Sequence, residues 1–181
     1  MALRPRPPQH RATAKAVLIS RQDSAWDMDR LDEEVEKLEP DDRGGHPYVQ
    51  YMQGETRFDL GAMVSWKNGR SSPRDYLEGE PDAQFVLRRL SVEQVAEIRD
   101  AAERERGRDE SAWNAIMVRA ARMGLGDIEG EGWSFALDGR GLASAETMQG
   151  IYDAGGISLV TEIGWAVYLY SQPLSEQEKK V

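Results

Sequence analysis

Residues 84–124 read QFVLRRLSVEQVAEIRDAAERERGRDESAWNAIMVRAARMG, and this stretch decides the fold that the sequence predicts. Its start, Gln84 to Arg88, is a short apolar run typical of a β-strand. Ser91 followed by Gln94 matches the capping box that begins a helix. The apolar residues after this cap recur on one helical face: Val92, Val95, Ile98 and Ala102. We therefore expect a strand that leads into a helix ending near Arg106.

A second helix is predicted directly after the first. Asp109 or Ser111 can cap its beginning, and Gly124 suits its end. Its apolar residues share one face: Trp113, Ile116, Met117, Ala120 and Met123. An apolar face at this spacing is typical of a helix packed against a core.

The remainder of the second half is predicted to be mostly helical. After a glycine-rich loop, residues 133–137 are expected to form a strand, and Asp138-Gly139 supplies a turn. A short helix is expected over residues 144–154, closed by Gly155-Gly156. Residues 157–170 are apolar nearly all round, which indicates a buried helix, although their WAVYLY part also suits a strand.

The first half contains shorter elements. Residues 16–19 suit a strand, and residues 28–38 suit an acidic helix with an apolar face. Asn68-Gly69 favours a tight hairpin turn after a strand that ends near Trp66. The arginines and prolines of residues 1–13 predict an extended arm. The expected fold is therefore α+β, with short strands and a hairpin in the first half, a helical second half and an extended N-terminal arm.

Length and composition fit one domain with an appendage. A chain of 181 residues can bury a single core. We expect a basic arm over residues 1–13 and one α+β domain over residues 14–181, loop- and strand-rich over 14–82 and mostly helical over 83–181.

Charge is unevenly distributed along the chain, whose net charge is -9. The residues before Asp23 carry five bases and no acid, whereas Asp23 to Asp42 carry ten acids and two bases. An acidic domain repels nucleic acid at long range, so we do not expect the whole domain to bind it. The acidic segment itself is interpreted as a solvated helix face.

Several function classes lack the residues that they require. The absence of cysteine excludes disulfides, thiolate catalysis and cysteine-based zinc sites. The opening residues hold charges and prolines where an export signal needs apolar ones. The longest apolar run is shorter than the about 18 residues that span a bilayer. We therefore expect a soluble protein without membrane contact. Neither His10 nor His46 has a nucleophile at a suggestive spacing, and no phosphate-binding glycine loop is present. The sequence predicts no catalytic residue and no cofactor.

One acidic pattern resembles a calcium loop. Counted from Asp127, acids stand at positions one, three, five and twelve, namely Asp127, Glu129, Glu131 and Asp138, with Gly132 at position six. The glutamates are too long for a tight loop, and two further glycines delay the helix that should follow. We interpret the pattern as an acidic connector and predict no metal site.

Other side chains are interpreted as structural or partner-binding. Glu162 lies within the apolar 157–170 segment and needs a partner, for which the sequence offers three arginines: Arg88, Arg119 and Arg122. The five tryptophans, spread one per segment, indicate core anchors: Trp26, Trp66, Trp113, Trp133 and Trp165. Trp26 lies in a polar region and is a candidate partner contact, together with the arm residues Arg4, Arg6 and Arg11.

The second half resembles a class of phage proteins. FVLRRLSVEQVAEIRDAAERE (85–105), IMVRAARMGLGDIEG (116–130) and GISLVTEIGWAVYLYSQPLSEQEKK (156–180) are similar to small tailed-bacteriophage proteins encoded among the structural genes, including tail-assembly chaperones. The resemblance begins at Gln84 and carries no catalytic constellation. It implies a protein that works by binding other proteins.

The combined prediction is a non-enzymatic phage virion structural or assembly protein. Its expected partners are other phage structural proteins, in repeated copies within a symmetric assembly, and its expected location is the virion or the host cytoplasm during assembly. One alternative is a transient tail-assembly chaperone. The other is a carboxylate- or metal-dependent enzyme that uses Asp127, Glu129, Glu131 and Asp138.

Overall fold

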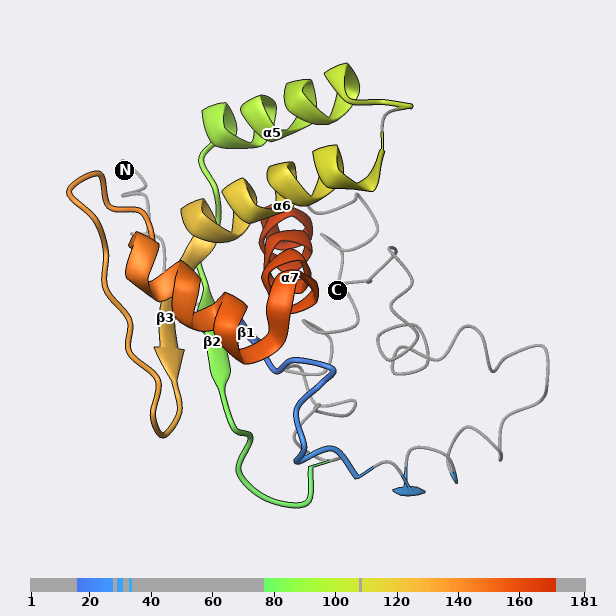
Figure 1. The fold of residues 1–181 in the computed structure, drawn as a ribbon, viewed down its shortest axis with the longest axis vertical. Coiled ribbons are helices and arrows are strands. Elements are labelled where there is room, and N and C mark those ends of the chain that lie inside the picture. Colours follow the sequence, from blue (N-terminus) through green and yellow to red (C-terminus); the bar gives the residue numbers. More distant parts are fainter. Residues whose placement is uncertain (1–15, 28, 31–32, 34–76, 108, 172–181) are drawn as a thin grey trace, which may run out of the picture.

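The protein is represented by a computed structural model, which describes residues 16–27, 29–30, 33, 77–107 and 109–171 (Figure 1). Its elements, in chain order, are β1 Ala16–Leu18, β2 Gln84–Leu87, α5 Val92–Arg104, α6 Glu110–Gly124, β3 Leu125–Glu129 and α7 Ala145–Ser171. The α+β prediction is confirmed. The arm over residues 1–13, the hairpin at Asn68-Gly69, both histidines and most of the predicted acidic helix lie outside the described residues.

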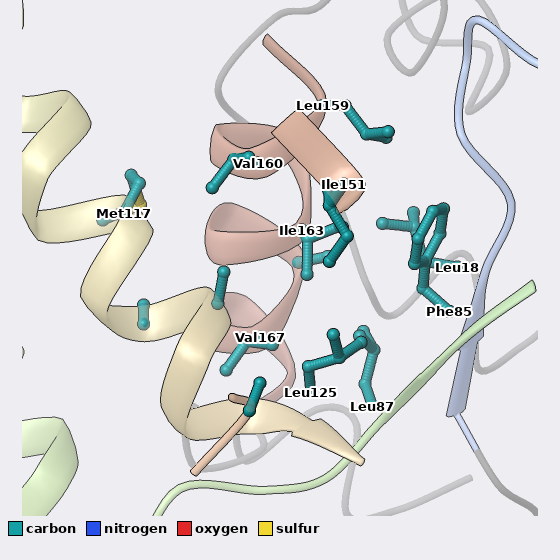
Figure 2. Packing of buried hydrophobic residues seen from close by; sticks show 14 of the residues in the cluster. Leu18, Phe85, Leu87, Met117, Leu125, Ile151, Leu159, Val160, Ile163 and Val167 are labelled. Atoms are coloured by element: carbon teal, nitrogen blue, oxygen red, sulfur yellow. The ribbon is translucent and has the colours of Figure 1, made fainter. Parts of the chain in front are cut away.

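The sheet has the order β1-β2-β3, and both pairings are antiparallel. Residues directly opposite one another share a face, so Leu18, Phe85 and Ile128 form one apolar row across the three strands. Leu87 and Leu125 extend this face, and all five side chains are buried. Figure 2 shows the labelled sheet residues pointing toward α7, which covers this face.

The helices form a layer in which α5 and α7 lie on opposite sides of α6 (Figure 1). Helix α5 begins with the predicted capping box, in which the Gln94 N–H donates to Ser91 Oγ and the Ser91 N–H donates to Gln94 Oε1. Asp109 caps α6, and its side chain accepts from the Ala112 N–H. Asp109 is one of the two residues that the sequence predicted as the start of this helix. Val92 was predicted to belong to the apolar face of this helix. At the first position of α5 it is instead 82% exposed.

Helix α7 is two helices joined at a kink. Gly156 has φ 66° and ψ -164°, a conformation that only glycine adopts readily. The segment before it is capped by Ser144, whose hydroxyl accepts from the Thr147 N–H. The predicted break at Gly155-Gly156 is therefore confirmed, and residues 157–171 are helical rather than extended.

The third strand lies where the sequence predicted a loop. Residues 133–137 contain only an isolated bridge from Leu137 to Ala143, so the predicted strand there is wrong. The true strand, β3, follows α6 at once, and its pairing is anchored by the Arg88 N–H, which donates to the Gly124 carbonyl at 2.8 Å. Pairing with β2 overrides the low strand propensity of LGDIE, because Leu125 and Ile128 both reach the core.

Helices α6 and α7 cross in close contact at two glycines. A Cβ atom on Gly164 would overlap the Met117 carbonyl, and one on Gly124 would overlap the Val167 side chain. The neighbour at Gly164 is backbone, which cannot rotate aside. The helix axes can approach this closely only while Gly164 has no side chain.

We expect Gly164→Ala to lower the free energy of unfolding by about 1–3 kcal/mol, because the helices must separate to admit the methyl group. Gly150→Ala is the matched control within α7, since nothing lies within 4 Å of the added Cβ, and it should raise stability by about 0.5–1 kcal/mol. Urea unfolding of both variants measures the difference. Equal effects at the two positions would contradict the close crossing.

Candidate interaction surface

Two tryptophans from different helices stack on each other beside the α6–α7 crossing. The ring centroids of Trp113 and Trp165 are 5.8 Å apart, with an interplanar angle of 20°. Tyr168, one turn along α7, meets Trp165 edge-on at 6.1 Å and 75°. We call Trp113, Trp165 and Tyr168 the aromatic row. All three side chains are half-buried, so the row is packed against the core and still reaches the surface.

The crossing explains why the row forms. Gly164 lies against Met117, so the next residue of α7, Trp165, lies beside α6. Trp113 precedes Met117 by four residues and therefore shares its face of α6. The tryptophan stack is thus a consequence of the way in which α6 and α7 cross.

The end of α7 is fixed to the connection between β2 and α5. The Leu90 N–H donates to Ser171 Oγ at 2.9 Å, and that hydroxyl donates to the Val167 carbonyl at 2.7 Å. Arg89 places its guanidinium 4.9 Å from the centre of the Tyr170 ring. This cation–π contact adds a second link between the end of α7 and the connection that follows β2.

An open groove of ≈ 550 Å³ separates parts of α5 and α6. Its lining is mostly small and apolar, with charged residues at the rim: Ala101, Arg104, Glu105, Ala112, Ala115, Ile116 and Arg119. Arg119 is joined across the groove to Glu97 of α5 at 2.9 Å. The groove exists because alanines stand where larger side chains would fill the space.

The acidic pattern does not form a calcium loop. Asp127 and Glu129 belong to strand β3, where they pair with β2, and Asp138 instead binds Arg122 at 2.8 Å. Within the described residues, no three side chains of the metal-binding types come together. The pattern from Asp127 to Asp138 is therefore divided between a strand and a later turn instead of forming one loop.

Asp138 organises the turn before α7. Its carboxylate accepts from the N–H groups of Leu142 and Arg140, and these bonds, followed by the charge of Arg122, hold its pKa below the ordinary value. Arg122 also donates to the Ala143 carbonyl, and Arg88 donates to the carbonyls of Met123 and Gly141. These charges serve to hold a loop against the end of α6.

None of Arg88, Arg119 and Arg122 is seen to bind Glu162. Its carboxylate accepts from Ser20 Oγ and from the Arg21 N–H, both at 2.9 Å. The bond joins α7 to the residues that follow β1, 142 positions earlier in the chain. Glu162 therefore holds the N-terminal strand region to the helical layer.

The side chain of Trp26 is buried in the fold. Its side chain is 6% exposed, its indole N–H donates to the Ser20 carbonyl at 2.8 Å, and its backbone forms a bridge with Leu77. These contacts give it a structural role, and its contact with another subunit stays a prediction. Arg4, Arg6 and Arg11 lie outside the described residues.

The sequence analysis did not predict the aromatic row, because the sequence shows each tryptophan only as a separate apolar residue.

Comparison with family models, with curated proteins and with solved structures found no match to this chain. Within the described residues, none of the helices, α7 included, combines the length and apolar content needed to cross a membrane.

We expect Glu162→Ala to lower the free energy of unfolding by about 1–3 kcal/mol, since the Ser20 hydroxyl and the Arg21 N–H lose their acceptor. Glu162→Gln keeps one acceptor oxygen and should lose less. Hydrogen exchange would locate the effect at β1, whose amides should lose protection first. Unchanged exchange at β1 would show that Glu162 does not hold this region.

We expect Asp138→Asn to lower the melting temperature at neutral pH and to differ less from the parent protein in acid. Because the folded-state pKa is depressed, the carboxylate stabilises the fold above its unfolded-state pKa, and this contribution is lost as pH falls through the folded-state pKa. Melting curves from about pH 7 to about pH 2 measure the trend. Glu131→Gln, at an exposed site, is the control. A difference that stays constant with pH would exclude the charge as its cause.

Proposed function

We propose that the chain is a non-enzymatic structural or assembly protein of a tailed bacteriophage, which acts through contacts with other protein subunits in repeated copies. The observation that carries the proposal is the aromatic row, which reaches the surface beside α6 and α7. Tryptophan and tyrosine are enriched where proteins bind one another, because they bury a large apolar area and keep a polar group. A rigid helix crossing that presents such rings suits a binding surface.

The use of the charged side chains supports the same proposal. Arg88 and Arg122 bind backbone carbonyls, Asp138 organises a turn, and Glu162 holds the region after β1. Each of these groups has a structural task within the described part of the chain. Asp138 and Glu162, two of the acids that the sequence analysis singled out, thus have structural tasks in this part of the chain.

The phage assignment is supported by the resemblance of residues 84–180 to small tailed-phage proteins. These residues include α6 and α7, which form the aromatic row, and α5, which lines the groove together with α6. The proposed surface therefore lies within the resembling region. Retention in the particle distinguishes a virion component from a transient tail-assembly chaperone, and mass spectrometry of purified particles would find the former in many copies and the latter in none.

The basic arm supplies the other half of the proposed contact. Residues 1–15 contain Arg4, Arg6, Arg11 and Lys15 and no acid, in a chain whose net charge is -9. Opposite charges favour contact between such an arm and the acidic body of a subunit. An arm of this composition can wrap a neighbouring surface and order on binding.

We expect deletion of residues 1–13 to leave the melting temperature nearly unchanged and to abolish self-assembly. The deletion ends before Ala16, so it spares β1, Glu162 and its partners. Light scattering of full-length and shortened protein across a concentration series measures the assembly. A shortened protein that assembles as the full chain does would refute the tethering role of the arm.

A further inference from the structure

We propose that the aromatic row receives the Arg4-Pro5-Arg6-Pro7-Pro8 segment from a second copy of this chain. The inference rests on the proposed function and deepens it, because it names the surface that binds the arm. The groove between α5 and α6 lacks aromatic lining and suits this segment less well. Three features of the described residues support the pairing.

The first feature is the match between the segment and the rings. A segment with three prolines among five residues favours the polyproline II conformation, which loses little entropy on binding and is recognised by aromatic-lined surfaces. Trp113 and Trp165 provide such a lining, held in place from two helices and half-buried. Proline rings can therefore pack on the parts of the indoles that remain at the surface.

The second feature is the match between arginine and the surroundings of the row. Aromatic rings bind a guanidinium over their faces, as the Tyr170 ring binds Arg89 elsewhere on α7. Glu110 lies one turn before Trp113 on the same face of α6 and is exposed. Arg4 and Arg6 would thus meet the aromatic surface of the row and a carboxylate.

The third feature is the position from which the arm leaves the fold. Ala16 pairs with Leu87, at the end of β2 that leads to Arg89 and Leu90. Pro8 precedes Ala16 by eight residues, and an extended chain of this length spans about 26–29 Å. An arm with this reach is long enough to contact a neighbouring copy. A contact in which each copy gives an arm and receives one joins subunits head to tail and produces the repeated assembly that the proposed function requires.

Photo-cross-linking in the full-length chain tests the pairing. A benzoylphenylalanine replaces Leu3, directly before the segment, so that both arginines stay in place. Unlabelled chains are mixed with ¹⁵N-labelled chains before irradiation. We expect cross-linked peptides of mixed isotope composition that join the arm to α6 and α7 around Trp113 and Trp165. Mixed cross-links to another region would overturn the receiving surface and leave the tethering role of the arm intact. Cross-links confined to one isotope would show that the arm binds its own chain and would overturn the inference.

A second measurement follows the tryptophans themselves. In protein labelled with fluorotryptophan, the fluorine resonances of Trp113 and Trp165 should shift when the full chain assembles, whereas the buried Trp26 should not respond. Arg4→Ala combined with Arg6→Ala should weaken assembly about tenfold. These two substitutions lie in the arm, so they leave the described core unchanged. Val92→Ser, at an exposed apolar residue of α5, is the surface control and should have no effect.

The outcomes separate this inference from the proposed function. If the arm deletion abolishes assembly while the Trp113 and Trp165 resonances do not move, the arm binds elsewhere and only the inference fails. If the deletion leaves assembly intact, the tethering function fails as well.

Discussion

The close contact between Gly164 and the Met117 backbone is the constraint on which the rest of the structure depends. It sets the separation of α6 and α7, so that Ile163 and Val167 can reach the apolar face of the sheet while Trp165 meets Trp113. A wider crossing would open the core on one side and separate the rings on the other. The same missing side chain therefore determines both the packing of the fold and the geometry of the candidate surface.

The elements that were predicted correctly are those whose signals are local. The capping box at Ser91, the acidic cap at Asp109 and the break at Gly156 each act within a few residues, and each determines where a helix begins or ends. Strand β3 was missed because its sequence, LGDIE, has little strand propensity. The segment becomes a strand because it pairs with Phe85 and its neighbours, which lie far away in the chain. No local sequence pattern predicts that pairing.

The candidate surface was less predictable than the fold, for the same reason. The sequence indicated that Glu162 needed a partner, yet the partner is a serine and a backbone N–H 142 and 141 positions away rather than one of the available arginines. The calcium-like spacing of Asp127 to Asp138 was visible, but spacing along a chain implies a loop only if the backbone turns there, and the first three residues of that segment belong to a strand. The tryptophan stack likewise arises only from the helix crossing.

Charge alone cannot assemble copies of this chain. Each copy has a net charge of -9, so two bodies repel one another, although physiological salt screens that repulsion beyond about 8 Å. Attraction must come from short-range contacts, for which the half-buried aromatic row supplies apolar area and the acid-free arm supplies the opposite charge. If the arm of one copy binds the row of another, as proposed, every subunit that binds through one would still offer the other, because both belong to the same chain. Growth would then continue until the subunits close into a ring or are stopped by a different partner.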